Sequence, residues 1–276
     1  MSNITLNYYV VDVFTDKVFG GNPAGVCLLD DWLPDETLQN IAMENNLSET
    51  AYLVKKDGSG SQVACYDLRW FTPTIEIDLC GHATMGSAYV LFTFIEKEAH
   101  RIEFHTLSGM LAVEKDSDML WMDLPSRPAD PVQKYDSINK SLGLEDYEVY
   151  KSADILIIVD NEEIVKSLRP DFHILKELKD EADMPGDNFV IIVSAQGSDC
   201  DFVSRVFAPN CGVDEDPVTG RAHCVLTPYW SKILARTSLT AQQLSTRGGQ
   251  LWCEDAGNRV KIGGTAVLYL HGQINV

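Results

Sequence analysis

The sequence lacks any apolar run that approaches the length of a membrane span, which is about 20 consecutive residues for a helix. Its start, Met-Ser-Asn-Ile-Thr-Leu-Asn, has neither the basic region nor the apolar stretch of a secretory signal. Low-complexity segments and a convincing linker are also missing. These absences predict a globular protein of the cytoplasm with no membrane partner.

Positive charge is scarce, with 22 Lys and Arg residues against 41 Asp and Glu residues and a net charge of −19. Binding to nucleic acid or to an anionic membrane requires a basic face that attracts phosphate groups. The composition therefore predicts that nucleic acid is not a partner. A strongly acidic chain can still hold a locally positive pocket for a small anion.

The sequence lacks pairs of closely spaced cysteines. Its seven cysteines are odd in number and scattered along the chain. That distribution argues against a disulfide framework and against a zinc site. We expect most of these thiols to be small buried hydrophobic groups. No metal and no cofactor are predicted.

What the sequence does contain is a long internal repeat within 276 residues, of which 45% are hydrophobic and 23% charged. The matching positions recur half a chain length apart: Arg69, Phe71 and Pro73 with Arg205, Phe207 and Pro209, and Thr106, Gly109, Leu111 and Glu114 with Thr246, Gly249, Leu251 and Glu254. A repeat of this length indicates a duplicated half-domain rather than a solenoid. We predict lobes at 1–120 and 121–276, which face each other across a shared cleft.

Hydrophobic periodicity predicts many short strands and one long helix in each half. Helices are expected at 34–46, 83–95, 162–168, 172–179 and 221–235. Strands are expected at 8–14, 26–29, 51–55, 64–71, 102–104, 110–114, 119–124, 147–151, 154–159, 189–194, 202–207, 250–253, 259–262 and 265–270. The pattern favours an α+β fold in which a sheet wraps around a central helix.

Both copies of the repeat place glycine where the long helix begins, at Cys80-Gly81-His82 and at Thr219-Gly220. A helix N-terminus presents free backbone N–H groups and the positive end of the helix dipole. Glycine lets a ligand approach that backbone closely, although it also permits close packing of helix on sheet. Two such turns predict a binding site for a carboxylate or an enolate.

Three ionisable residues are candidates for the chemistry. His82 lies at the first turn, where the helix dipole favours its neutral form. Asp216 precedes the second turn and is either a helix cap or a substrate ligand. Glu49 directly precedes an apolar strand, so it is either an ordinary surface glutamate or a general base whose pKa is raised by burial.

Two further possibilities carry less weight. Cys80, at a helix N-terminus, could move a proton, but two-thiol racemization needs a second cysteine where Asp216 stands, and Cys211 lies five residues earlier. The acidic run from Asp214 to Asp216 suggests a metal site. It is discounted because Pro217 stiffens the loop and no second ligand cluster is evident.

Taken together, these segments resemble the PhzF family of phenazine biosynthesis-like proteins, which have the diaminopimelate-epimerase fold. The matching segments, which run in family order over most of the chain, are Gly21-Asn22-Pro23-Ala24, Leu47-Ser48-Glu49-Thr50-Ala51, Arg69-Trp70-Phe71-Thr72-Pro73, Leu79-Cys80-Gly81-His82-Ala83-Thr84 and Glu215-Asp216-Pro217-Val218-Thr219-Gly220. The segments Phe207-Ala208-Pro209, Tyr229-Trp230 and Arg247-Gly248-Gly249 look especially like the animal branch of the family.

The resemblance implies two pseudo-symmetric lobes, each a barrel-like, mostly antiparallel sheet around a central helix, with the last strand returning to the first lobe. It also implies a homodimer and a cofactor-independent isomerization of a small anionic metabolite. Glu49 falls on the family's catalytic glutamate, while His82 and Asp216 fall on its other site residues. The residues expected to bind the substrate are Asn22, Ser48, Cys80, Gly81, Thr219, Gly220 and Arg221.

Arg221 departs from the family pattern, in which a small serine usually follows the glycine of the second turn. The long cation could clamp a substrate carboxylate, or it could fill the pocket and pair with Asp214, Glu215 or Asp216. Two alternatives to the isomerase therefore stay open. One is a racemase or epimerase that uses Cys80, and the other is a binding or scaffold protein without catalysis.

Overall fold

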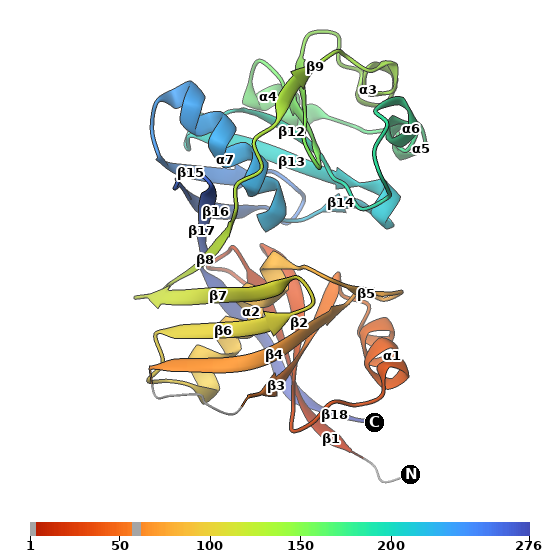
Figure 1. The fold of residues 1–276 in the computed structure, drawn as a ribbon. Coiled ribbons are helices and arrows are strands. Elements are labelled where there is room, and N and C mark those ends of the chain that lie inside the picture. The colour runs from red at the N-terminus through yellow and green to blue at the C-terminus, as the bar shows by residue number, and fades with distance from the viewer. Residues whose placement is uncertain (1–3, 57–61) are drawn as a thin grey trace. The chain divides into compact units, whose positions relative to one another are not determined.

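The computed structural model describes residues 4–56 and 62–276, so the first three residues of the N-terminal stretch discussed above lie outside it. The chain divides into two compact units (Figure 1). The first comprises Met1–Asp123 together with Gly263–Val276, and the second comprises Leu124–Ile262. No helix in the described part of the chain is long and apolar enough to cross a membrane.

The first unit is built on one sheet with strand order β18–β1–β2–β3–β4–β6–β7–β8, and β5 pairs with the end of β4. Its strands are β1 (Thr5–Val13), β2 (Asn22–Leu29), β3 (Glu49–Lys55), β4 (Val63–Phe71), β5 (Glu76–Ile77), β6 (Arg101–Thr106), β7 (Gly109–Asp116), β8 (Met119–Pro125) and β18 (Ala266–Asn275). The β2–β3 and β4–β6 pairs are parallel, and the others are antiparallel.

Helix α2 (Gly81–Val90) is the centre of the first unit, and a π-helical turn (Leu91–Ile95) extends it. Every residue from His82 to Ala88 is buried, as expected for a helix that is surrounded by a sheet. A Cβ added at Gly86 would lie 3.3 Å from Ala24 and from Val13, which shows how closely the helix approaches β1 and β2. Helix α1 (Asp35–Asn45) covers the outer face of the sheet.

The second unit repeats this plan with strand order β9–β10–β11–β12–β13–β15–β16, and β14 pairs with the end of β13. Its strands are β9 (Asp130–Val132), β10 (Glu148–Lys151), β11 (Ile155–Ile158), β12 (Ile191–Gln196), β13 (Phe202–Ala208), β14 (Val213–Asp216), β15 (Ser238–Gln243), β16 (Gly249–Asp255) and β17 (Arg259–Gly264). The parallel pairs β11–β12 and β13–β15 correspond to β2–β3 and β4–β6 of the first unit.

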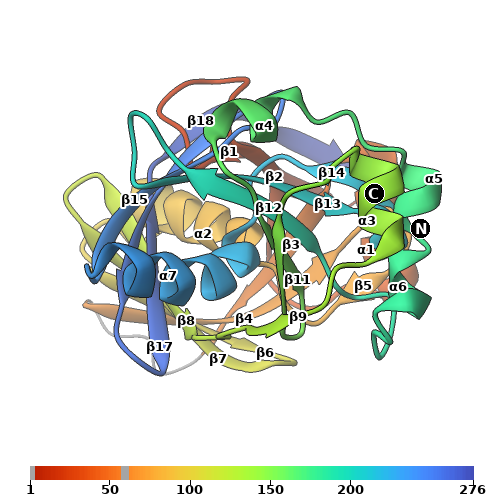
Figure 2. The ribbon, with the colours of Figure 1, turned by 90° about the horizontal axis from the view of Figure 1, so that it is seen from above.

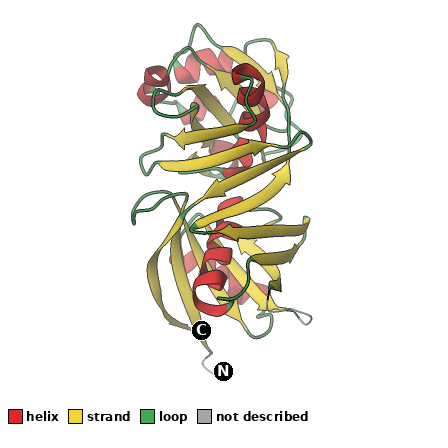
Figure 3. Ribbon diagram, turned by 90° about the vertical axis from the view of Figure 1, so that its left-hand side faces the viewer, coloured by secondary structure: helices red, strands yellow, loops and turns green. Residues whose placement is uncertain are grey.

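Helix α7 (Gly220–Leu234) is the counterpart of α2 and packs against β15 and β16 (Figure 2). The remaining helices are short: α3 (Asp136–Leu142), α4 (Glu162–Ser167), α5 (Phe172–Leu175) and α6 (Leu178–Glu181). Strands make up most of both units (Figure 3). The predicted α+β class with two pseudo-symmetric, sheet-dominated units is confirmed.

Several elements differ from the predictions. No helix or strand was predicted for residues 128–146, where β9 and α3 lie. Strands β5, β14 and β15 were also missed. Every second residue of β15 is buried, but its sequence, Ser-Leu-Thr-Ala-Gln-Gln, is only weakly hydrophobic. Strand β18 continues five residues beyond the predicted end at Leu270, because its main chain pairs with β1 along most of its length. Ile233, an apolar residue of the predicted helix 221–235, is exposed.

Candidate active site

Glu49 is the first residue of β3 and lies opposite Ala24 of the parallel strand β2. Helix α1 ends four residues earlier, and Asn46 then takes a left-handed conformation with φ 49° that turns the chain back. The turn leads through Leu47 and Ser48 directly into the strand. Strand β3 therefore begins earlier than predicted, and the carboxylate belongs to the sheet instead of a surface loop.

The first helix-opening turn presents Cys80 and His82. Cys80 caps α2 in an extended conformation, and its carbonyl accepts hydrogen bonds from the Thr84 N–H at 3.2 Å and from the Thr84 hydroxyl at 2.6 Å. Both residues are buried, at 7% and 5% exposure. The Thr84 contacts hold the backbone of this turn in place.

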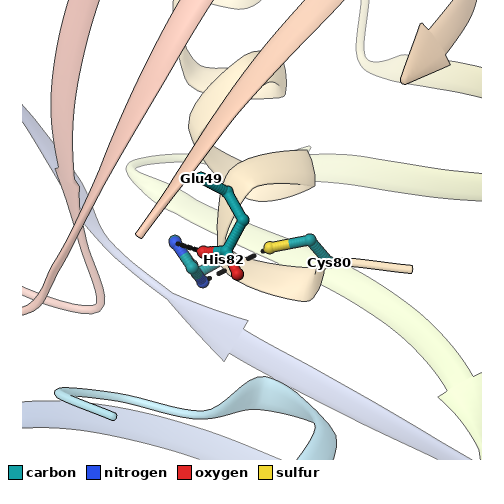
Figure 4. A group of neighbouring side chains, drawn as sticks. All are labelled: Glu49, Cys80 and His82. Atoms are coloured by element: carbon teal, nitrogen blue, oxygen red, sulfur yellow. Dashed lines mark hydrogen bonds and ion pairs between the residues drawn. The ribbon is translucent and has the colours of Figure 1, made fainter. Parts of the chain in front are cut away.

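Glu49, Cys80 and His82 converge at this turn (Figure 4). His82 Nε2 lies 3.2 Å from Glu49 Oε2, and His82 Nδ1 lies 3.5 Å from Cys80 Sγ. The buried amide of Asn22, at the start of β2, places its Nδ2 3.3 Å from the same Nδ1. Three of the predicted site residues, Asn22, Glu49 and Cys80, thus contact the fourth, His82.

Burial lowers the pKa of His82 from 6.5 to about 3, while the nearby Pro23 carbonyl acts weakly in the opposite direction. The ring is therefore neutral at physiological pH, as the sequence predicted, although burial is the larger cause. If the Asn22 amide donates to Nδ1, the ring proton is on Nε2, which faces Glu49. The contact with Glu49 is then one between a neutral donor and a carboxylate, not an ion pair.

The second helix-opening turn is held by a different network. Thr219 caps α7, and its hydroxyl donates to the carboxylate of Asp216. The side chain of Gln243, which is fully buried, accepts from the Thr219 N–H at 2.9 Å and donates to the Asp216 carbonyl at 2.7 Å. Gly220 is the first residue of α7 and is buried. The sequence left open whether Asp216 caps this helix. The capping residue is Thr219, and Asp216 accepts a hydrogen bond from its hydroxyl.

Sequence reasoning missed two residues of this turn. Gln243 lies on the unpredicted strand β15, far from the turn in sequence. His223 is fully buried, its Nδ1 lies 2.9 Å from the Thr219 carbonyl, and burial lowers its pKa to about 4. The position of His223 on the same helix face as Thr219, one turn later, was the available signal.

The guanidinium of Arg221 binds side chains of the second unit. Its Nη2 and Nε lie 2.7 Å and 3.2 Å from the two carboxylate oxygens of Asp154, which is completely buried, and its Nη1 binds the Asn188 side chain at 2.9 Å. The predicted partners Asp214, Glu215 and Asp216 were wrong, because the arginine reaches across to the loop before β11. The expected bidentate clamp on a carboxylate exists, but Asp154 supplies that carboxylate.

The same pair of charges anchors both turns. Arg69 on β4 binds both oxygens of Glu76 at 2.7 Å, and Arg205 on β13 binds those of Glu215 at 2.7 Å and 2.9 Å. Both glutamates lie on the short strands, β5 and β14, that lead to the helix-opening turns. The arginines of the sequence repeat thus make the same ion pair in both units, which ties a central strand to the segment that leads into the helix.

The first turn also has the composition of a metal site, and the prediction of no metal stays a prediction. One ligand atom each from Glu49, Cys80 and His82 can be chosen so that all three lie within 4.8 Å of one another. Carboxylate, thiolate and imidazole are all ligands of Zn²⁺. Ser48 and Gly81 are adjacent to this group in the chain, and both are partly buried.

Comparisons with known proteins agree with the fold. A family model described as phenazine biosynthesis-like protein matches residues 11–272. An uncharacterized isomerase of Pseudomonas aeruginosa is 45% identical over 271 residues, which cover 98% of this chain and 99% of that protein. The crystal structure of a PhzF-family phenazine biosynthesis protein from Enterococcus faecalis superposes with a TM-score of 0.92 at 44% identity, over 99% of this chain and 100% of that one.

The human phenazine biosynthesis-like domain-containing protein is 38% identical over 288 residues, with 98% of this chain and 99% of that protein covered. Over the whole chain these bacterial relatives are more similar than this animal protein, and the likeness of three short segments to the animal branch stays a prediction.

Proposed function

The chain belongs to the family of phenazine biosynthesis-like proteins, and we propose that it is an isomerase that shifts a proton within a small carboxylate-bearing metabolite. The names of its bacterial relatives support the isomerase class. The observation that carries the proposal is the contact of Glu49 with the neutral His82 at the N-terminus of α2.

In the proposed reaction, the Glu49 carboxylate removes a proton from a carbon next to a carbonyl or carboxylate group. The electrons of the broken C–H bond form an enolate, and Glu49 returns the same proton to another carbon of the conjugated system. The double bond moves as the proton moves, so the product is an isomer and neither an oxidant nor a second substrate is needed. Such acid–base catalysis contributes about 10²–10⁴-fold to a rate.

The enolate requires stabilisation, which the start of α2 can supply. The first N–H groups of a helix, here those of Gly81 and His82, have no partners within the helix and point toward an anion in front of it. Neutral His82 can donate a hydrogen bond without placing a competing positive charge beside Glu49. Asn22 fixes the orientation of the imidazole ring through Nδ1.

Asp216, Thr219 and Gly220 were predicted to bind the substrate, and that role stays a prediction. Within the second unit, Gln243 holds their turn in shape. The Asp154 contact of Arg221 supports a structural task for that arginine, so binding of the substrate by Arg221 stays a prediction.

A two-step experiment tests this function. Thermal shift against a panel of small carboxylic acids first identifies ligands that stabilise the folded protein. Each ligand is then incubated in D₂O with wild type, with Glu49→Gln, and with the exposed-residue control Glu44→Gln. We expect rearrangement with wild type and with the control, and binding without rearrangement for Glu49→Gln. Equal turnover by Glu49→Gln would remove the mechanism.

Racemization with Cys80 is the second candidate, and the 3.5 Å contact of its thiol with His82 Nδ1 favours it. In that reaction the product keeps its connectivity and only a stereocentre gains deuterium from the solvent. Loss of this wash-in on Cys80→Ala would establish the racemase, and unaltered wash-in would exclude Cys80 as an acid–base group.

We also propose a homodimer in the cytoplasm, on the basis of the family resemblance. Light scattering coupled to size-exclusion chromatography tests the dimer, with the expected mass twice the 30.7 kDa of one chain. A mass of one chain at micromolar concentration would contradict it.

A further inference from the structure

The side chains at the first turn have a second chemical capability besides proton transfer. Among the residues that the structure describes, Glu49, Cys80 and His82 offer one oxygen, one sulfur and one nitrogen, all within 4.8 Å of one another. Cys80 and His82 are buried, whereas the Glu49 side chain keeps 17% of its surface exposed. This combination of hard and soft ligands matches Zn²⁺ and related thiophilic cations.

The three ligand atoms lie within reach of a tetrahedral zinc centre, at no more than 4.8 Å from one another. With Zn–S near 2.3 Å and Zn–N and Zn–O near 2.0–2.2 Å, neighbouring ligand atoms lie roughly 3.3–3.6 Å apart. The structure has 3.5 Å between Cys80 Sγ and His82 Nδ1, and 3.2 Å between His82 Nε2 and Glu49 Oε2. Since a cation uses only one ring nitrogen and the two contacts involve different nitrogens, the imidazole has to rotate and the other ligand atoms have to approach the nitrogen that is used.

An independent observation points to a ligand at this place. His82 Nε2 is completely buried, yet it makes no well-aligned hydrogen bond to any of residues 4–56 or 62–276, although it faces Glu49. A buried polar atom in this state costs free energy until something binds it. A cation that binds Nε2 takes the place of the ring proton there, and the neutral ring then carries its proton on Nδ1.

We propose that Glu49, Cys80 and His82 form an inhibitory binding site for a thiophilic divalent cation, represented by Zn²⁺. On binding, the Cys80 S–H bond breaks and its proton goes to solvent, as the sulfur forms a bond to the metal. The imidazole nitrogen and a carboxylate oxygen of Glu49 supply the other protein ligands, which leaves one position for water or for a substrate carboxylate.

Occupation of this site removes the Glu49 lone pair that the proposed isomerization requires. Binding itself does not depend on the isomerase function, whereas the inhibition rests on it. The two parts are therefore measured separately, and failure of one is distinguishable from failure of the other.

The binding experiment uses the full-length reduced protein and Co²⁺ as a spectroscopic substitute for Zn²⁺, without any substrate. A cobalt–thiolate bond produces a charge-transfer band in the near ultraviolet, and tetrahedral Co²⁺ produces strong visible bands. We expect both in wild type at one cobalt per chain, displaced by one Zn²⁺. The matched control is Cys211→Ser, because Cys211 is an exposed thiol outside this group.

Cys80→Ser is expected to abolish the charge-transfer band, and Glu49→Gln to weaken Zn²⁺ binding in calorimetric titrations. Loss of a mere outer-shell partner costs a metal site about 10–100-fold in affinity, so loss of a direct ligand should cost at least about tenfold. Absence of the band in wild type overturns the site. A band that persists in Cys80→Ser but disappears in Cys211→Ser overturns it as well.

The inhibition is tested with the carboxylic acid that the D₂O experiment identifies as substrate. Stoichiometric Zn²⁺ should stop rearrangement by wild type, and a chelator should restore it. Full activity with the site occupied would overturn the inhibitory part. If cobalt binds as expected but no acid is ever rearranged, the metal site stands and the isomerase proposal falls.

Discussion

In both units an arginine on a central strand binds a glutamate on the short strand that leads into the helix-opening turn. The guanidinium carbons of Arg69 and Arg205 also lie at the same distance, 5.1 Å, from the ring centres of Phe71 and Phe207. A bidentate pair that is stacked on an aromatic ring fixes direction as well as distance. The duplication thus preserved the device that positions each turn.

The side chains that these turns present are very different. The first turn brings a carboxylate, a thiol and an imidazole into contact, and its histidine has no well-aligned partner at Nε2 within the described chain. In the second turn, Thr219, Gln243 and Asp216 bond to one another, and Arg221 binds Asp154. The first turn thus gathers ionisable groups from separate elements, whereas the polar groups of the second turn bind one another.

The largest expected difference between the turns is catalytic. Glu49→Gln should reduce kcat by about 10³-fold, because it removes the general base. Asp216→Asn should cost about tenfold or less, since the amide can still accept from Thr219. Steady-state kinetics on the identified acid measures both. A loss for Asp216→Asn that equals the loss for Glu49→Gln would mean that the second turn takes part in the chemistry.

The next effect concerns the stability of the second turn. Asp154→Ala should lower the free energy of unfolding by about 3 kcal/mol, because a partly buried Arg221 loses its carboxylate and the Val190 N–H loses its acceptor. Urea unfolding followed by circular dichroism measures the change. Asp214→Ala, an exposed acid on the same unit, is the control and should change it by less than about 0.5 kcal/mol. Equal effects would show that Arg221 is not anchored by Asp154.

The two buried histidines should make stability depend on pH. Their folded pKa values, about 3 for His82 and about 4 for His223, lie below the ordinary 6.5, so the unfolded chain binds more protons between these limits. Stability is complete above pH 6.5 and falls as the pH drops, by up to about 1.4 kcal/mol per pH unit for each ring.

Urea unfolding at pH 7 and pH 5 measures this slope in wild type, His82→Gln and His223→Gln. The pH slope of each variant should be smaller than that of wild type by the contribution of one proton. An unchanged slope in His82→Gln would mean that its ring is protonated in the folded protein, contrary to the neutral role given to it.

The smallest expected effect is a difference in stability between substitutions in the Arg69–Glu76 and Arg205–Glu215 ion pairs. Lysine cannot form the bidentate contact, so Arg205→Lys should cost about 1–2 kcal/mol and Arg69→Lys less than about 1 kcal/mol. The order follows from exposure, since the Arg205 side chain is 10% exposed and that of Arg69 is 23% exposed. Thermal and urea unfolding check the order. A larger loss for Arg69→Lys would contradict this ranking by burial.

Features of the sequence that act over a few residues were predicted well. Pro34 and the acids after it mark the start of α1, which begins at Asp35, and the glycines mark the starts of α2 and α7 to within two residues. Glu49, His82 and Asp216 were identified as candidates from their places beside these elements. Their catalytic and binding roles stay predictions.

Features that depend on distant partners were missed. Gln243 contacts Thr219 across 24 positions, and Asp154 contacts Arg221 across 67. Nothing in the local pattern around Asp154 distinguishes a fully buried ion-pair partner from a loop aspartate. The weakly hydrophobic strand β15, which carries Gln243, is stabilised by its pairing with β13 and β16 and not by its own composition.

The sequence by itself determined the duplication, the two glycine-containing turns and the identities of the ionisable groups beside them, because backbone preferences and capping act within a few residues. Tertiary structure alone decided which of these groups meet. Parallel pairing of β2 with β3 brings Asn22 and Glu49 to the same end of the sheet, where α2 begins, and only that register places Glu49 against His82. Tertiary structure also decided that Arg221 pairs with Asp154, because a buried carboxylate is costly unless a cation lies beside it.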